Sequence, residues 1–101
     1  MEGGAMQGMS RALFEEVKWN SQSITSVDWK KFPVFKFGMP LPVIETVLID
    51  RKDKPHMGAG ETIITVVAAA IANAIYDATG ARLREVPFTY DRVMIALQAR
   101  S

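Results

Sequence analysis

The stretch from Ile63 to Ile75 constrains the fold of this 101-residue chain more than any other segment. Its sequence, "IITVVAAAIANAI", is apolar around the whole circumference of a helix, and only Thr65 and Asn73 interrupt it. A helix that is apolar on every side is buried on every side, and a domain of about 100 residues rarely has enough other layers to surround one. We therefore expect the chain to be a piece of a larger protein, or to cover this helix by forming oligomers.

The composition excludes several classes of protein. Apolar residues make up 49% and charged residues 23%, which are ordinary globular values, and the formal net charge of +1 does not favour nucleic acid as a partner. There is no cysteine, so disulfides and thiolate metal sites are excluded within this chain, and the single histidine, His56, cannot form a multi-histidine site. The apolar run is shorter than the roughly 18–20 residues needed to cross a bilayer. We expect a soluble protein. The sequence does not decide between the cytoplasm and the periplasm as its compartment.

The spacing of apolar residues predicts an α+β fold with three helices and a few short strands. Helices are expected over residues 4–19, 61–80 and 88–100, with Thr89 as the N-cap of the third and Gly80 as the C-terminal stop of the second. Gly8 in the first helix indicates close approach to another element. The clearest strand is predicted at "VIETVLIDR", residues 43–51, with weaker ones in residues 20–29 and 81–87. We interpret residues 1–101 as a single domain.

An acid lies at the mouth of the apolar helix, where "GAGE" ends in Glu61. The glycines allow positive φ angles and close approach of the main chain to a ligand, and a helix start presents free N–H groups with partial positive charge. A carboxylate kept ionised by that charge, but pushed toward neutrality by burial, suits a general base. The simpler alternative is that Glu61 only complements the helix dipole in the first turn. Ile63 stands where a third glycine would be needed for a dinucleotide fingerprint, and there is no Gly-Lys-Ser/Thr of a P-loop.

Three segments, in this order, resemble a known family of enzymes. They are "GGAMQGMSRALFEE" (residues 3–16), "DWKKFPVFKFGMPLPVIETVLID" (residues 28–50), and "GAGE" followed by "VVAAAIANAIYDATGARLREVPFTYDRV" (residues 66–93). Together they resemble the C-terminal segment of the molybdopterin-binding subunit in the xanthine dehydrogenase and aldehyde oxidase family, closest to the isoquinoline 1-oxidoreductase β-subunit type. The resemblance covers essentially the whole chain. It implies that residues 1–101 are the C-terminal part of a molybdopterin-binding domain in a bacterial enzyme.

The resemblance also implies roles for individual residues. Glu61 falls on the family's catalytic glutamate, which takes the proton from the attacking, water-derived oxygen beside the metal. Gln7 falls on a position that hydrogen-bonds the cofactor. The other expected cofactor contacts form the glycine turn: Gly58, Ala59 and Gly60. The implied cofactor is molybdopterin in its cytosine dinucleotide form, bound in the full-length parent and not expected in the isolated chain. Thr62 departs from the proline that the family often carries, which predicts a looser helix start.

The activity implied for the parent is hydroxylation of an N-heteroaromatic compound (isoquinoline-like) or an aldehyde. Electrons would leave through iron–sulfur clusters on a separate subunit or domain, so the implied partners are that subunit, the rest of the molybdenum subunit and a small substrate, and not nucleic acid. The isolated chain is expected to be inactive and to form homo-oligomers through its exposed apolar surface. Two alternatives remain open: a non-catalytic fragment or interaction module that keeps the family shape, and a binder of small anions at the helix start.

Overall fold

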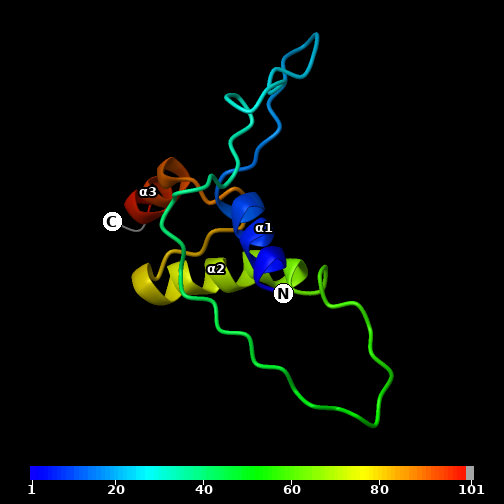
Figure 1. The fold of residues 1–101 in the computed structure, drawn as a ribbon. Helices are drawn as coiled ribbons and strands as arrows, with labels where there is room; N and C mark the ends of the chain where they lie inside the picture. The colour runs from blue at the N-terminus through cyan, green and yellow to red at the C-terminus, as the bar shows by residue number, and fades with distance from the viewer. Residues whose placement is uncertain (100–101) are drawn as a thin grey trace.

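The computed structural model describes residues 1–99 and contains three helices joined by long connections (Figure 1). They are α1 (Glu2–Leu13), α2 (Ile64–Thr79) and α3 (Tyr90–Gln98). α1 packs across α2, and α3 lies beside the C-terminal end of α1 (Figure 1). The prediction of three helices is confirmed, while residue 100, where the third was expected to end, lies outside the described residues. None of the three is long and apolar enough to span a membrane.

Two glycines let α1 approach α2 closely. A Cβ atom added at Gly8 would lie 2.8 Å from Cβ of Val67, and one added at Gly4 would lie 2.5 Å from the carbonyl oxygen of Gly60. Real Cβ atoms do not tolerate such distances, because they are well inside the van der Waals contact of two heavy atoms. The close approach predicted at Gly8 is therefore confirmed, and the neighbouring element is α2.

The ends of the helices follow local sequence signals in two cases and tertiary contacts in a third. Gly80 ends α2 in the left-handed conformation, with φ of 70°, and the Thr89 hydroxyl accepts the N–H of Arg92 at the start of α3, as predicted. By contrast, α1 ends at Leu13, well before the expected end at residue 19. There the carbonyl of Ala12 accepts the N–H of Phe88, with 2.7 Å between the nitrogen and the oxygen. The chain leaves the helix because this carbonyl binds another segment instead of extending the helix.

The hydrophobic core is small and lies where α1, α2 and the segment before α3 meet. Its centre is formed by the buried side chains of Ala12, Leu83 and Phe88. On α2, Val67 is the only buried residue, so one side of this helix packs on α1 while the other faces outward. Complete burial of α2 is thus not reached within residues 1–99, in line with the expectation that more protein surrounds it.

The strands predicted from the sequence do not form within the described residues. Residues 43–51 carry no strand pairing, and they belong to a long connection that swings away from the helices (Figure 1). Residues 20–29 contribute one position, Ile24, to an isolated antiparallel bridge with Trp19, and residues 81–87 run without pairing. The predicted strands are not observed within residues 1–99. A strand needs a neighbouring strand for its N–H and C=O groups, and residues 1–99 provide none.

Candidate functional site

An open groove of about 540 Å³ lies between α1 and the turn that precedes α2. From α1 it is lined by Gly3, Gly4, Gln7 and Arg11, and from the turn and α2 by Gly60, Glu61, Ile64 and Thr65. The structure therefore brings together three of the residues that the sequence singled out: Gln7, Gly60 and Glu61. The other two, Gly58 and Ala59, are exposed in the preceding loop and do not line the groove.

Glu61 lies in a turn before α2, not in its first helical turn. The main-chain carbonyl of Glu61 accepts the N–H of Ile64 at 3.1 Å, and its side chain is exposed and makes no cap with the helix. The first turn of α2 contains no acidic residue, so Glu61 lies just ahead of the turn in which the simpler interpretation placed it. The carboxylate instead projects from the rim of the groove, where a ligand can reach it.

Threonine side chains explain why the helix begins late. The Thr62 hydroxyl donates to the carbonyl of Ala59 at 3.1 Å, and the Thr65 hydroxyl donates to the carbonyl of Thr62 at 2.8 Å. Such side-chain bonds compete with the regular helical ladder. The α-helix accordingly starts at Ile64, in agreement with the looser start expected from threonine in place of proline.

The glycines around the groove contribute bare main chain and not unusual dihedral angles. Among the described residues only Gly38 and Gly80 have positive φ, so Gly58 and Gly60 do not adopt the positive φ that glycine allows. A Cβ atom added at Gly58 or Gly60 would meet nothing within 4 Å, and the same holds for Gly3 across the groove. Close approach of a ligand to the main chain is therefore the property these positions retain.

The polar groups of the groove suit a ligand that accepts hydrogen bonds or carries negative charge. Arg11 lies four residues after Gln7 and so shares its helix face, which places a guanidinium and an amide side by side. Sequence reasoning missed Arg11, although its spacing from Gln7 was the available signal. No group of three or more His, Asp or Glu side chains that could hold a metal is found in residues 1–99. The groove thus combines hydrogen-bond donors from α1 with the carboxylate of Glu61.

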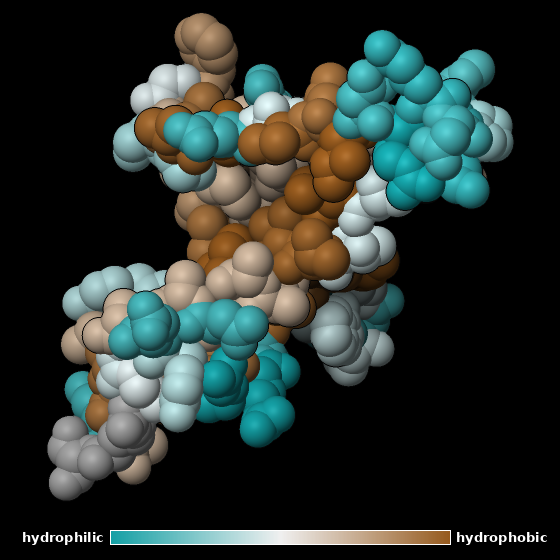
Figure 2. All heavy atoms as spheres, turned by 90° about the horizontal axis from the view of Figure 1, so that it is seen from below, coloured by the Kyte–Doolittle hydropathy of each residue, from teal (hydrophilic) through white to brown (hydrophobic). Residues whose placement is uncertain are grey.

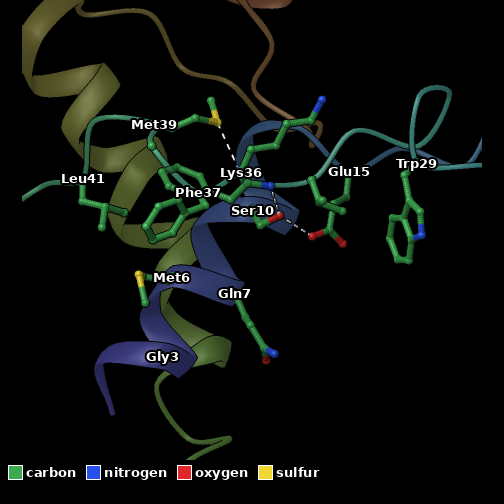
Figure 3. Close-up of a pocket in the computed structure, with 13 residues that line it drawn as sticks. Gly3, Met6, Gln7, Ser10, Glu15, Trp29, Lys36, Phe37, Met39 and Leu41 are labelled. Carbon is green, nitrogen blue, oxygen red and sulfur yellow. Dashed lines mark hydrogen bonds between the residues drawn. The ribbon is translucent and has the colours of Figure 1, made fainter.

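A second, apolar groove of about 800 Å³ lies on the other side of Gln7, between α1 and residues 29–41 (Figure 3). Figure 3 shows Met6, Phe37, Met39 and Leu41 around it, while the Gln7 amide points away from this apolar group. The buried Ser10 hydroxyl donates to the Glu15 carboxylate and accepts the N–H of Phe35 at 3.0 Å. The bond from Phe35 holds the 29–41 segment against α1, and the exposed Gln7 lies between the two grooves.

Two other polar residues singled out by the sequence lie away from both grooves. His56 is an exposed loop residue. The side-chain oxygen of Asn73 accepts a hydrogen bond from Arg82 at 2.8 Å. Asn73 therefore links α2 to the segment after it.

Comparison with known proteins supplies relatives over nearly the whole chain, although no protein-family model matches it. The chain is 42% identical over 97 residues to a nicotinate dehydrogenase subunit of Pseudomonas putida, a match that covers 96% of this chain and 8% of the relative. It is 32% identical over 99 residues to the aldehyde oxidoreductase molybdenum-binding subunit PaoC of Escherichia coli, covering 91% of this chain and 13% of the relative. This chain is a relative of bacterial molybdenum-binding oxidoreductase subunits.

Two further relatives refine this relationship. The β-subunit of isoquinoline 1-oxidoreductase from Brevundimonas diminuta is 31% identical over 87 residues, covering 86% of this chain and 11% of the relative, which supports the family seen in the sequence. A membrane-bound aldehyde dehydrogenase of Gluconacetobacter polyoxogenes is 33% identical over 97 residues, covering 96% of this chain and 12% of the relative, and its name gives pyrroloquinoline quinone. The chain spans only about a tenth of the length of these oxidoreductases, so it corresponds to one short segment of them.

Proposed function

We propose that residues 1–101 form the C-terminal part of the molybdopterin-binding domain of a bacterial molybdenum hydroxylase, with Glu61 as its catalytic base. The observation that carries this proposal is the groove in which Gln7, Gly60 and Glu61 meet from opposite halves of the chain. The proposed reaction is hydroxylation of an N-heteroaromatic compound or an aldehyde with oxygen from water. The names of the relatives, which refer to nicotinate, isoquinoline and aldehydes, support these two classes of substrate.

Each residue of the groove has a distinct task in this proposal. Molybdopterin, proposed in its cytosine dinucleotide form, supplies the two-electron oxidation. The Gln7 amide and the Arg11 guanidinium donate hydrogen bonds to the cofactor from α1, and the bare main chain at Gly60 permits close approach. Gly58 and Ala59 extend this approach along the loop. Glu61 takes the proton from the water that supplies oxygen, which is the task of a general base placed beside the reacting atoms.

The remaining parts of the enzyme are proposed to lie outside this chain. The rest of the molybdenum subunit would complete the cofactor pocket, and an iron–sulfur subunit or domain would take up the electrons. Two of the relatives are named as one subunit of a larger enzyme, which supports the presence of other subunits. The isolated 101-residue chain is therefore expected to be inactive, and light scattering is expected to show it as a dimer or larger assembly.

The decisive variant is Glu61→Gln in the full polypeptide that carries this chain. We expect turnover to fall by about 10²-fold or more, the usual contribution of a general base, with the molybdenum content per chain unchanged. Asp77→Asn is the matched control, because it also replaces an exposed acid by its amide, on α2 but outside the groove. Wild-type turnover in a fully loaded Glu61→Gln enzyme would refute the role of Glu61.

Metal analysis of the native polypeptide separates this proposal from its alternatives. Molybdenum that co-purifies with a much longer chain supports the hydroxylase. A quinone without molybdenum would favour the cofactor named for the Gluconacetobacter relative. A chain of about this length without either cofactor would favour the non-catalytic interaction module. The many exposed apolar side chains support this alternative.

A further inference from the structure

Residues 43–50, "VIETVLID", form an exposed apolar segment whose main chain has no hydrogen-bond partner within residues 1–99. The side chains of Val43, Val47 and Ile49 are 89%, 81% and 83% exposed. Figure 2 shows that apolar atoms also gather in a continuous area across the middle of the face seen from below. Exposed apolar surface of this kind is normally covered by another part of a protein.

The side chains of this segment are apolar on both faces of an extended chain. Because successive side chains point to opposite faces, one face carries Val43, Val47 and Ile49 with one acid, Glu45. The other face carries Ile44 and Leu48 with Thr46, and Asp50 lies at its end. A strand that is apolar on both faces is typical of a sheet covered on both sides. β-branched residues also favour a strand over a helix here.

The segment has clear ends that match a single strand. Pro40 and Pro42 precede it, and proline cannot donate a main-chain hydrogen bond within a sheet. After it, the N–H of Lys54 bonds the carbonyl of Arg51 at 3.0 Å and closes a turn. Between these boundaries the main chain is free to pair along both of its edges.

We propose that residues 43–50 are a strand of a sheet whose other strands belong to the surrounding polypeptide of the longer subunit. The relatives provide that polypeptide, since this chain spans only 8–13% of their length. A second copy of the chain is a poorer occupant, because its equivalent strand would pair with one edge and leave the apolar faces exposed. The proposal is independent of the chemistry assigned to Glu61.

Hydrogen–deuterium exchange tests this proposal directly. In the isolated 101-residue chain at low concentration, the amides of residues 44–50 are expected to exchange at nearly the rate of an unstructured peptide. In the full polypeptide that carries this chain, the same amides are expected to exchange at least about 100-fold more slowly, because opening of the sheet limits exchange. Rapid exchange in both would overturn the proposal. Protection in the full polypeptide that disappears on dilution would also overturn it, in favour of pairing between two copies.

A pair of variants at one position separates main-chain pairing from simple side-chain burial. Val47→Pro removes the N–H group, whereas Val47→Ala keeps it and removes most of the side chain. We expect Val47→Pro to lower the melting temperature of the full polypeptide clearly more than Val47→Ala, and both to leave the helix content of the isolated chain unchanged. Equal melting temperatures for the two variants would contradict a paired strand. A molybdenum-loaded, active enzyme with an unprotected segment would refute the strand and leave the proposed function standing.

Discussion

The core beside the helices and the connection between α1 and α2 differ in how far each buries a phenylalanine side chain. Phe88, next to α3, is 7% exposed, whereas Phe37 in the connection is fully exposed. A helix satisfies its own main chain, so it needs only an apolar neighbour, and α1 and α2 provide that for each other. An extended segment needs a partner for its main chain as well as for its side chains. The comparison teaches that residues 1–99 satisfy the main chain of the helices but leave one side of α2 uncovered, whereas the extended connection lacks partners for its main chain as well as its side chains.

The largest effect is expected from replacing a phenylalanine by alanine, once in the core and once in the connection. Phe88→Ala should destabilise the 101-residue chain by about 3 kcal/mol, because it leaves a cavity between Ala12 and Leu83. Phe37→Ala should change the free energy of unfolding by less than about 0.5 kcal/mol, as is usual for an exposed side chain. Urea denaturation followed by circular dichroism measures both. Similar losses for the two variants would show that Phe37 is also buried in solution, and the contrast between the two parts would fail.

A smaller effect is expected at the contact between α1 and α2. Gly8→Ala should cost about 1–2 kcal/mol, since the new methyl group would overlap the branched Cβ of Val67, which cannot move without the helix. Gly3→Ala, on the same helix but with nothing within 4 Å, should instead stabilise the chain by about 0.5 kcal/mol through helix propensity. The two melting temperatures should therefore shift in opposite directions. Equal shifts would mean that α1 does not pack on α2 through its glycines.

The smallest effect is expected from an ion pair within the connection. The Arg51 guanidinium donates to Asp53 at 2.8 and 2.7 Å and lowers the pKa of that carboxyl from its ordinary value of 3.8. A lowered pKa contributes stability above the ordinary value, which is lost as the pH falls through the lowered one. Because the pair is fully exposed, no measurable change in unfolding is expected. Arg51→Ala should raise the pKa of Asp53 toward 3.8 in an NMR titration, whereas Lys52→Ala should raise it less. An unchanged pKa in Arg51→Ala would show that the pair is absent in solution.

The parts of the fold that were predictable depend on residues close together in the sequence. The stop at Gly80 and the cap at Thr89 follow from the chemistry of neighbouring residues, and both are observed. The end of α1 was not predictable, because it depends on the N–H of Phe88 reaching the carbonyl of Ala12 from the other end of the chain. The strand predicted at residues 43–51 is not formed within residues 1–99, because these residues contain no neighbouring strand with which it could pair.

The candidate site was predictable to the extent that it depends on a motif. Gln7 and Glu61 stand out by resemblance to a family, and the structure places both on one groove with Gly60. Arg11 carries no motif of its own, and its relevance appears only once the face of α1 is known. Gly58 and Ala59 were assigned to the site together with Gly60 and Glu61. The turn before α2 directs the chain so that only Gly60 and Glu61 reach the groove.

Gly4 lies directly against the carbonyl of Gly60 and the side chain of Ile63, where α1 meets the turn before α2. Gln7 lies one helical turn beyond Gly4, and Glu61 directly follows Gly60. Any side chain at position 4 would push the two segments apart and so change the separation between the hydrogen-bond donor and the acid. In a genetic screen for lost activity, substitutions of Gly4 should therefore appear together with substitutions of Gln7 and Glu61, although glycine has no functional group to lose.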